Sequence, residues 1–545
     1  MTFEQKLKSC SEKEVWQEYC GFLNLTIDEF MSIQTRLMME QIELFANSPL
    51  GEKILQGNRP KTIDEFRQMV PLTTYDDYAD ILLSKQNEML PMEPIIWIQT
   101  TWEGGKHPVK VAPYTKAMLD TYKNNIIACM ILSTSSAREQ FNIKPHDKFL
   151  YGLAPLPYAT GILPLVFDDQ ISLDFLPNVK DALDMTFSQR NATGFKLGMQ
   201  SGIDYFFGLG SVLYYISNNF GKMLQSKSGG GLSSLKKCSF PMLVKLARAK
   251  YACSHEKRDM KPKDLFTLKG FMCAGTDSAC YKDALEDLWG IRPMEIFAGT
   301  EPTCIGTENW TRNGMYFFPD VCLYEFIPES EMQKNMEDPT YIPSTCLINQ
   351  VVSGEKYELV ISLFKGGVFA RYRVGDVYRC IGLKNTEDGS QIPRFTYIDR
   401  VSNVIDIAGF TRITENSITE AISLSGLDVK NWIATKEYNQ NNHPFLHLYV
   451  EMSESSYLTR AITTDVLREH LSIYFKYLDS DFNDLKRILE MDPLEITIVR
   501  NGSFDHYQKN YGKAIAKINP SSHILLDFLK SCNENYDVGG GGICR

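Results

Sequence analysis

Phe297-Ala298-Gly299-Thr300-Glu301 (FAGTE) follows an apolar run and sets a hydroxyl beside a carboxylate, directly after a small, flexible glycine. Such a turn can bring the backbone close to a nucleotide and offer Glu301 to Mg²⁺, a hard cation that takes oxygen ligands. A second stretch, YRVGD at residues 372–376, ends in Asp376, whose carboxylate can accept hydrogen bonds from a ribose diol. Each pentapeptide alone is most often a plain turn. The two pentapeptides in this order, together with the further segments described below, predict a nucleotide site.

The composition indicates a globular protein of more than one lobe. The 545 residues exceed what one hydrophobic core usually supports, and 43% of them are hydrophobic and 23% charged. The net charge of −10 disfavours a nucleic-acid or anionic-membrane surface. No apolar run is long enough to span a bilayer, and the charged N-terminal segment has no apolar signal core. The 13 cysteines contain no C-x-x-C pair, so we expect reduced thiols and a cytoplasmic protein without nucleic-acid or membrane partners.

Hydrophobic periodicity predicts strands that alternate with helices as far as residue 300, the pattern of an α/β fold. We expect helices at 3–20, 27–46, 116–133, 178–190, 201–224, 240–251 and 278–289, and from Tyr75 onward. We expect strands at 95–99, 148–156, 268–275, 314–327 and 346–364. The aromatic residues of 201–224 are interpreted as the core side of a helix.

The loop between the strand at 95–99 and the helix at 116–133 has the parts of a phosphate-binding loop. It reads TTWEGGKHPVK over residues 100–110. Backbone N–H groups and a cation in such a loop can cradle phosphates, although the Walker spacing is absent and a plain connection is an equal alternative. The candidate contacts are Thr100, Thr101, Gly104, Gly105 and Lys106.

A change of composition near residue 400 predicts a domain boundary. We expect a large α/β domain with mixed sheets and flanking helices at 1–399 and a smaller, mobile α+β domain at 400–536. Residues 537–545 read as a disordered tail. Within the large domain, Tyr158, Thr160 and Gly161 form a turn that could line a substrate pocket, although a purely structural turn is as good a reading.

The ordered set of segments resembles the adenylate-forming superfamily of acyl-CoA ligases, adenylation domains and luciferases. Within it, the chain is most similar to the acyl-acid amido synthetases of the auxin-responsive Gretchen Hagen type. The resemblance covers nearly the whole chain. The segments that carry it are FRQMVPLTTYDDY (66–78), the loop region 100–113, the stretch 268–301 that ends in FAGTE, LYEFIPESE (323–331), ARYRVGDVYRC (370–380), FTYIDRVSNVIDIAGFTRITENSI (395–418), NGSFDHY (501–507) and GKAIAKINP (512–520).

This resemblance implies an ATP-dependent, AMP-forming ligase that uses Mg²⁺. It would activate a small carboxylic acid to an acyl-adenylate and pass the acyl group to an amine, most simply an amino acid, to form an amide. By the same resemblance, Thr300 contacts the AMP phosphate, Glu301 binds Mg²⁺ and Asp376 holds the ribose hydroxyls.

Three further roles come from the resemblance alone. Gly275 and its neighbours would lie beside the adenine, and Arg400 would lie at the hinge, next to the ribose. Lys517 matches a C-terminal lysine that neutralises charge on the reacting carboxylate and the α-phosphate.

The phosphate loop departs from the pattern of the family, which has several hydroxyls around a central glycine. Here Trp102 and Glu103 stand near the glycine and threonine positions, and Glu103 would repel a triphosphate unless Mg²⁺ or Lys106 intervenes. Two alternatives therefore stay open: a thioester-forming acyl-CoA ligase, and a catalytically impaired nucleotide- or acyl-binding protein. The identity of the acid and the oligomeric state are not encoded in any recognisable pattern.

Overall fold

The computed structural model describes the chain as two compact units. The larger comprises Met1–Thr100 and Lys110–Asp399, and the smaller begins at Arg400. The described residues are 1–100, 107, 109–152, 155–183, 185, 187–218, 220, 238–275, 278–401, 404–407, 411–440, 442–453, 460–478, 492–512, 515–520 and 522–534. The predicted tail and the glycine-rich run near residue 230 lie outside them.

Helices form the N-terminal part of the larger unit: α1 (Phe3–Ser9), α2 (Glu12–Cys20), α3 (Ile27–Ala46), α4 (Pro49–Leu55), α5 (Ile63–Met69) and α6 (Ala79–Leu83). The predicted helix 3–20 is two helices, because Ser11 and Glu14 form a capping box that starts a new one. The helix expected from Tyr75 is the short 3₁₀ turn η2 (Tyr75–Asp77) followed by α6.

A seven-stranded sheet forms the centre of the larger unit among the described residues. Its order is β4-β3-β5-β6-β7-β8-β9. The strands from β4 to β7 are parallel, and β7, β8 and β9 pair antiparallel. Their bounds are β3 (Lys148–Gly152), β4 (Asp174–Leu176), β5 (Tyr205–Leu209), β6 (Gly270–Ala274), β7 (Met294–Gly299), β8 (Thr303–Thr307) and β9 (Tyr316–Phe317).

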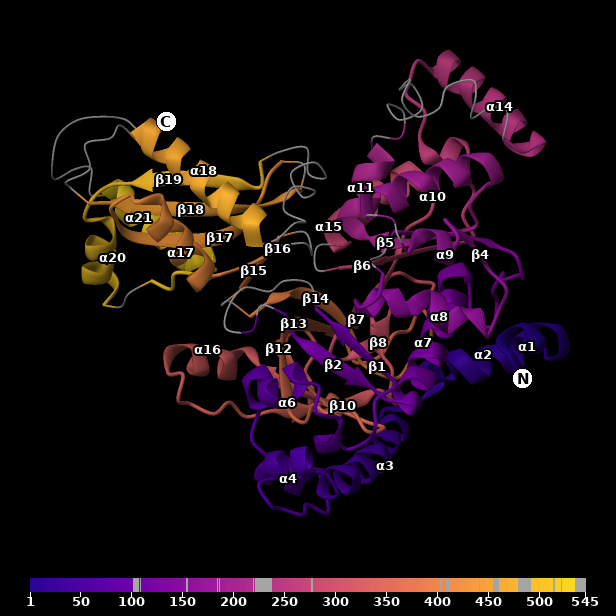
Figure 1. Cartoon of the computed structure of the whole chain (residues 1–545), viewed down its shortest axis with the longest axis horizontal. Helices are drawn as coiled ribbons and strands as arrows, with labels where there is room; N and C mark the ends of the chain where they lie inside the picture. Colours follow the sequence, from indigo (N-terminus) through magenta and orange to yellow (C-terminus); the bar gives the residue numbers. More distant parts are fainter. Residues whose placement is uncertain are drawn as a thin grey trace. The chain divides into compact units, whose positions relative to one another are not determined.

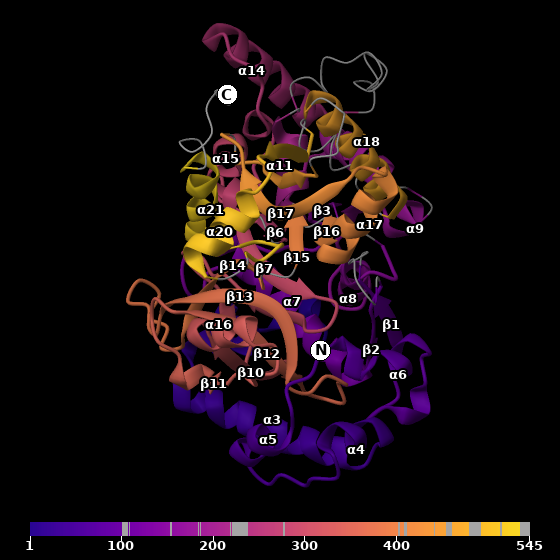
Figure 2. The ribbon, with the colours of Figure 1, turned by 90° about the vertical axis from the view of Figure 1, so that its left-hand side faces the viewer.

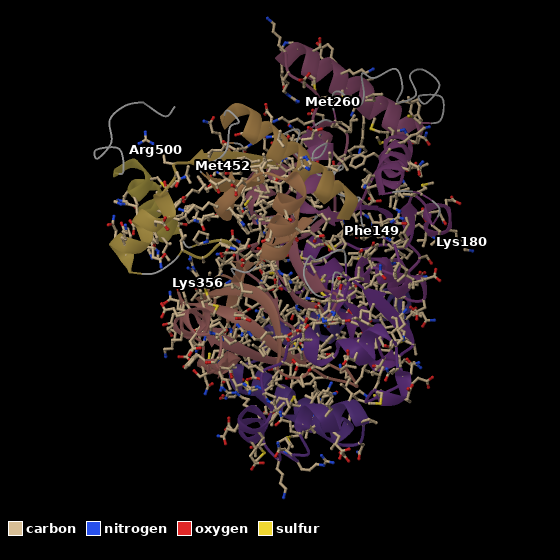
Figure 3. All side chains as sticks on the ribbon, turned by 60° about the vertical axis from the view of Figure 1, so that its left-hand side comes forward. Phe149, Lys180, Met260, Lys356, Met452 and Arg500 are labelled. Atoms are coloured by element: carbon tan, nitrogen blue, oxygen red, sulfur yellow. The ribbon has the colours of Figure 1, made fainter. Side chains whose placement is uncertain are left out.

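Helices cover both faces of this sheet. They are α7 (Lys116–Thr134), α8 (Leu163–Asp168), α9 (Val179–Ala182), α10 (Phe187–Ser201), α11 (Gly210–Asn218) and α15 (Ser278–Trp289), while α14 (Phe240–Glu256) packs against α10. Figure 1 shows α10, α11 and α15 on one side of β5 and β6, and α7 and α8 on the other. Side chains fill the space between these layers, and Phe149, labelled in Figure 3, is fully buried among them.

The predicted helix at 201–224 is wrong in its first part, because Tyr205–Leu209 is the strand β5 and the helix α11 begins only at Gly210. Successive aromatic residues of this strand point to opposite faces of the sheet. Phe206 packs against Phe195 and Trp289, whereas Phe207 lines the other face with Phe149. A strand buried on both faces reads as a continuous apolar run, which periodicity cannot distinguish from a buried helix.

A second, five-stranded sheet in the order β11-β10-β12-β13-β14 carries YRVGD. Its strands are β10 (Cys322–Pro328), β11 (Cys346–Leu347), β12 (Lys356–Leu363), β13 (Tyr372–Gly382) and β14 (Arg394–Arg400). Figure 2 shows the long β13 beside β12, with α16 (Glu329–Glu337) against β10 and β12. The strands β1 (Ile96–Gln99) and β2 (Val111–Tyr114) pair antiparallel, and residues 100–110 connect them.

The smaller unit is α+β. Its main sheet has the order β17-β18-β19, with β17 antiparallel and β19 parallel to β18, and Ile433, Tyr449 and Phe528 belong to its core. Its elements are β15 (Val404–Ile407), β16 (Thr411–Thr414), α17 (Glu415–Ser425), β17 (Val429–Tyr438), β18 (Pro444–Met452), α18 (Arg460–Leu478), β19 (Leu494–Val499), α20 (Ser503–Tyr511) and α21 (Ser522–Glu534). The predicted fold class, α/β with mixed sheets followed by a smaller α+β unit, is confirmed.

Three buried charges join α15 to the strands that lead to and from FAGTE. The ammonium of Lys282 lies 2.9 Å from the carboxylate of Glu295 and 2.7 Å from that of Glu308. Glu308 also accepts a hydrogen bond from the N–H of Glu295 at 2.8 Å. Burial raises the pKa of Glu295, and the ammonium of Lys282 opposes that rise. The cluster therefore fixes the base of the β7–β8 hairpin.

Replacing Lys282 by Met should lower the free energy of unfolding by about 3–5 kcal/mol, because it leaves two carboxylates buried without their cation. Chemical denaturation measures the change. Lys263→Met is the matched control, since Lys263 pairs with the exposed Asp287 at 3.2 Å and its loss should cost less than about 1 kcal/mol. Equal effects of the two substitutions would contradict the role of the cluster.

Candidate functional site

The sheet topology brings several predicted site residues to one edge. Gly275 follows β6, Thr300 follows β7, and the turn at 158–161 comes after β3. These strands are parallel, so their carboxyl ends share one edge of the sheet. In open α/β sheets this edge is where ligands bind.

FAGTE forms the connection of a tight hairpin. Gly299 at the end of β7 pairs with Thr303 at the start of β8, so Thr300, Glu301 and Pro302 make the turn. The hydroxyl of Tyr114 donates to the carbonyl oxygen of Thr300 at 2.8 Å. The turn is thereby held from outside the hairpin.

YRVGD forms a bulge in β13. Arg373 pairs with Val360 and Val377 pairs with Glu358, so residues 374–376 lie opposite Leu359 alone. Gly375 has φ 82°, a conformation that glycine adopts without strain. The bulge interrupts the regular alternation of the strand at Asp376, which is buried.

The two motifs contact each other through Glu301. The hydroxyl of Tyr372 donates to its Oε1 at 2.9 Å, and the ammonium of Lys110 lies 3.8 Å from the same oxygen. Glu301 is 8% exposed. A buried carboxylate needs such partners, because an unpaired charge is costly away from water. One side chain therefore joins FAGTE, YRVGD and the end of the phosphate loop.

Glu301 fits the single-carboxylate type of magnesium site. Mg²⁺ is commonly held by one or two carboxylates together with substrate phosphates. Within the described part of the chain, no cluster of three or more His, Cys, Asp or Glu side chains could hold a metal by itself. The donor set thus suits an ion that arrives with a phosphate ligand.

The ends of the phosphate loop are paired with each other. The N–H of Thr100 donates to the carbonyl oxygen of Lys110 at 2.9 Å, and the N–H of Lys110 donates to the hydroxyl of Thr100 at 3.1 Å. The predicted contacts Thr101, Gly104, Gly105 and Lys106 lie outside the described residues. The described ends place Thr100 and Lys110 side by side at the base of the loop.

Gly275 and Gly161 have backbone reasons for being glycine. Gly275 has φ 111° where β6 ends, and Ser278 donates to its carbonyl oxygen at 2.9 Å. A Cβ on Gly161 would lie 2.1 Å from the backbone nitrogen of Leu156. Tyr158 and Thr160 lie in the same turn, which the N–H of Gln99 joins by a hydrogen bond to Pro157 at 2.9 Å.

Arg400 ends β14. Lys517 belongs to the smaller unit, where its ammonium lies 3.0 Å from the carboxylate of Glu415 and 5.2 Å from the ring of Trp432. Its carbonyl oxygen accepts from the N–H of Ala434 at 2.7 Å. The side chain of Lys517 is 44% exposed, so its ammonium remains within reach of solvent.

Sequence reasoning missed the residues that surround Glu301. Lys110 ends the quoted loop TTWEGGKHPVK, and Tyr372 begins YRVGD. A cation and a hydroxyl group in these motifs could have been proposed as partners of the Glu301 carboxylate. Tyr75 lies inside the quoted segment 66–78, but neither Tyr75 nor Tyr114 could be assigned to the site, because their contacts join segments far apart in the sequence.

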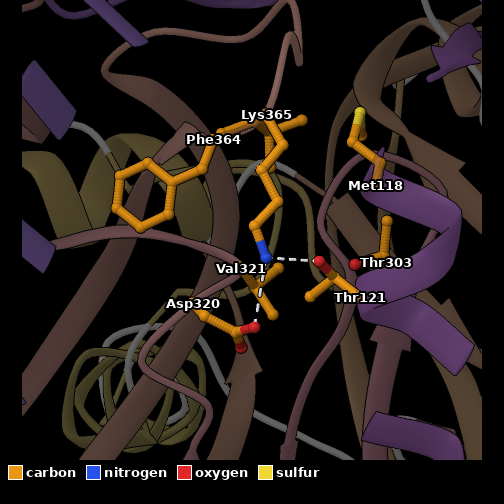
Figure 4. A pocket seen from close by; sticks show the side chains of 8 residues that line it. Met118, Thr121, Thr303, Asp320, Val321, Phe364 and Lys365 are labelled. Carbon is orange, nitrogen blue, oxygen red and sulfur yellow. Dashed lines mark hydrogen bonds and ion pairs between the residues drawn. The ribbon is translucent and has the colours of Figure 1, made fainter. Parts of the chain in front are cut away.

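A small polar pocket lies beyond FAGTE (Figure 4). The ammonium of Lys365 donates to the hydroxyl of Thr121 and lies 3.1 Å from the carboxylate of Asp320. Thr303 also lines this pocket, which holds about one water molecule. This space is too small for a nucleotide.

Solved structures share this architecture. The chain superimposes on 2-hydroxyisobutyryl-CoA ligase in complex with 2-HIB-AMP and CoA with a TM-score of 0.56 and 15% identity, over 89% of this chain and 88% of that one. At this identity the likeness shows the fold, which is that of the adenylate-forming ligases.

The sequence comparisons find a likeness to GH3 proteins over part of the chain. Residues 315–400 match the GH3 family central domain. The chain is 26% identical over 242 residues to jasmonoyl-L-amino acid synthetase GH3.5 of Oryza sativa subsp. japonica, covering 40% of this chain and 39% of that protein. It is 28% identical over 196 residues to indole-3-acetic acid-amido synthetase GH3.15 of Arabidopsis thaliana, covering 34% and 32%. The predicted resemblance to the GH3 acyl-acid amido synthetases is confirmed, over matches that span less than half of the curated relatives.

No helix in the described part of the chain is long and apolar enough to cross a membrane.

A double-mutant cycle tests the contact between the two motifs. Tyr372→Phe, Glu301→Ala and their combination should show a coupling free energy of about 1–3 kcal/mol in chemical unfolding, because the hydroxyl donates to a charged, buried acceptor. Additive effects of the two substitutions would show that the hydrogen bond contributes nothing.

Proposed function

We propose that the protein is an ATP-dependent, AMP-forming ligase that activates a small carboxylic acid and transfers the acyl group to an amine. The observation that carries the proposal is the contact of FAGTE and YRVGD through Tyr372 and Glu301. It joins the predicted phosphate and ribose contacts at the carboxyl edge of a parallel sheet, where nucleotides bind in other α/β proteins. The match to the GH3 family central domain over 315–400, which includes YRVGD, supports the same reading.

The proposed reaction needs cations more than covalent help. A carboxylate must approach the α-phosphate of ATP, so two anions have to be brought together. Mg²⁺, when bound, would neutralise phosphate charge, and Glu301 is the residue that would hold it. Lys110 adds a positive charge 3.8 Å from Glu301. Thr300 would contact the phosphate.

The remaining predicted residues would orient the nucleotide. We propose that Asp376 accepts hydrogen bonds from the ribose hydroxyls, with Arg400 next to the ribose and Gly275 beside the adenine. Thr100 and the rest of its loop would surround the phosphates. Residues 1–399 and 400–536 would act as separate domains, the second carrying Lys517 to the reacting carboxylate.

The names of the relatives favour an amide product. The matched rice and Arabidopsis proteins are named as a jasmonoyl-L-amino acid synthetase and an indole-3-acetic acid-amido synthetase. We therefore propose an amino acid as the acceptor. The net charge of −10 supports small-molecule partners over nucleic acid, and a cytoplasmic location remains a prediction.

Product analysis separates the possible outcomes. The protein is incubated with ATP, Mg²⁺, a panel of carboxylic acids, and either amino acids or CoA, and the products are identified by mass spectrometry. We expect AMP, pyrophosphate and an amide. A CoA thioester without any amide would replace the proposal by a thioester ligase, and tight ATP binding without pyrophosphate exchange for any acid would replace it by a binding protein.

Asp376 and Lys517 should fail in different ways. Asp376→Ala should weaken ATP binding itself, measured by calorimetry, because the ribose loses its acceptor. Lys517→Ala should keep much of that binding but slow pyrophosphate exchange by about 10² or more, because a charge contact in the transition state is lost.

Lys509→Ala, an exposed lysine of α20, is the matched control and should leave both measurements unchanged. Equal losses of ATP affinity in the Asp376 and Lys517 variants would show that these roles are wrongly assigned. An unchanged exchange rate in Lys517→Ala would show the same.

A further inference from the structure

A tyrosine from the N-terminal helical region holds the exit of the phosphate loop. The hydroxyl of Tyr75 donates to the carbonyl oxygen of Val111 at 3.0 Å and accepts from the N–H of Val111 at 2.8 Å. Val111 begins β2 directly after the loop 100–110. Both backbone polar groups of this residue are therefore bonded to one side-chain oxygen.

The ring of the same tyrosine lies beside the cation of the loop. The ammonium of Lys110 is 5.8 Å from the centroid of the Tyr75 ring, within the range of a cation–π contact. That ammonium also lies 3.8 Å from Glu301. Tyr75 thus bonds to the backbone directly after Lys110, and its ring lies near the ammonium of that lysine.

Tyr75 is itself tied to the strand that carries YRVGD. The N–H of Thr73 donates to the carbonyl oxygen of Arg371, and the N–H of Arg373 donates to the carbonyl oxygen of Thr73, each at 2.9 Å. The guanidinium of Arg371 donates to Val70 at 2.7 Å. Thr73 therefore forms a single parallel bridge to Tyr372, which places the residue two positions before Tyr75 against the start of β13.

These contacts form a closed series of neighbouring residues that includes Glu301. It runs from the start of β13 through Thr73 to Tyr75, then to Val111 and Lys110, and returns through Glu301 to Tyr372 on β13. Every step is a contact within the larger unit. A shift of Tyr75 would be passed directly to the cation beside Glu301.

We propose that Tyr75 is a positioning residue that sets the end of the phosphate loop, and with it Lys110, for nucleotide binding. This inference rests on the proposed function. It concerns the two ends of the loop, which are held by Thr100 and by Tyr75. Burial raises the pKa of Tyr75 to about 12, so its hydroxyl keeps the proton that it donates at neutral pH.

The chain offers a matched control three residues later. The hydroxyl of Tyr78 accepts from the N–H of Ala370 at 3.0 Å and donates to its carbonyl oxygen at 3.1 Å. Tyr75 makes the same pair of bonds to Val111 at the end of the loop, whereas Tyr78 makes them to Ala370, shortly before β13. Tyr78→Phe therefore removes the same pair of bonds, together with one to the hydroxyl of Thr73 at 2.9 Å, and leaves the contacts to Val111 and Lys110 in place.

The test compares Tyr75→Phe and Tyr78→Phe in the full-length protein. Both should lower Tm, because each leaves backbone groups without a partner. Only Tyr75→Phe should weaken ATP binding, by about tenfold in calorimetry, and raise KM for ATP more than it lowers kcat in pyrophosphate exchange. It should also speed hydrogen–deuterium exchange in the peptide that contains Val111.

Several results would overturn the inference. The first is a Tyr75→Phe variant whose ATP affinity and whose hydrogen–deuterium exchange at Val111 both equal those of the wild type. Another is an equal loss of affinity in both variants. If Tyr75→Phe does not fold, exchange in the wild-type protein still decides: saturating ATP should slow exchange of the Val111 peptide, and no change would refute the role. A wild-type protein that binds no ATP would refute the proposed function and, with it, the role of Tyr75 in nucleotide binding. Hydrogen–deuterium exchange at Val111 in Tyr75→Phe tests the contact between Tyr75 and Val111 independently of ATP.

Discussion

The hydrogen bond from Tyr372 to Glu301 is the contact on which the arrangement of the site depends. Glu301 stands in a hairpin turn of the seven-stranded sheet, and Tyr372 begins a strand of the other large sheet. A buried carboxylate is stable only where donors or cations reach it. The need to satisfy one charge therefore fixes how FAGTE and YRVGD meet, and Lys110 reaches the same oxygen from the loop.

Buried charges behind the motifs keep their strands in place. Glu325 on β10 accepts from Arg371 at 2.8 Å and from Arg67 at 3.3 Å, so the residue before YRVGD is anchored in the sheet. On the other sheet, Lys282 joins the two carboxylates at the base of the FAGTE hairpin. Such clusters stabilise little compared with an apolar core, but breaking one leaves an uncompensated charge. Their effect is to hold the two turns on rigid strands.

Local pattern predicted the elements whose signals lie within a few residues. The helices at 27–46 and 278–289 have the predicted bounds. Pattern failed at Tyr205–Leu209, where burial on both faces removes the alternation that marks a strand. For the site, Thr300, Glu301 and Asp376 could be proposed because the motifs contain them. Tyr75 and Tyr114 could not, because their partners lie 36 and 186 residues away and no local rule encodes such contacts.

The geometry of the loop ends explains how an unusual sequence can be accommodated. A hydroxyl-rich loop supplies phosphate donors from its own side chains, whereas TTWEGGKHPVK has few. Here the two ends of the loop are fixed by described contacts: Thr100 pairs with Lys110, and Tyr75 holds Val111. Backbone N–H groups can bind an anion whatever the side chains are, provided that the backbone is held in one conformation. The contacts at the two ends use the backbone of Lys110 and Val111 and the hydroxyls of Thr100 and Tyr75, so they do not depend on which side chains stand between the ends.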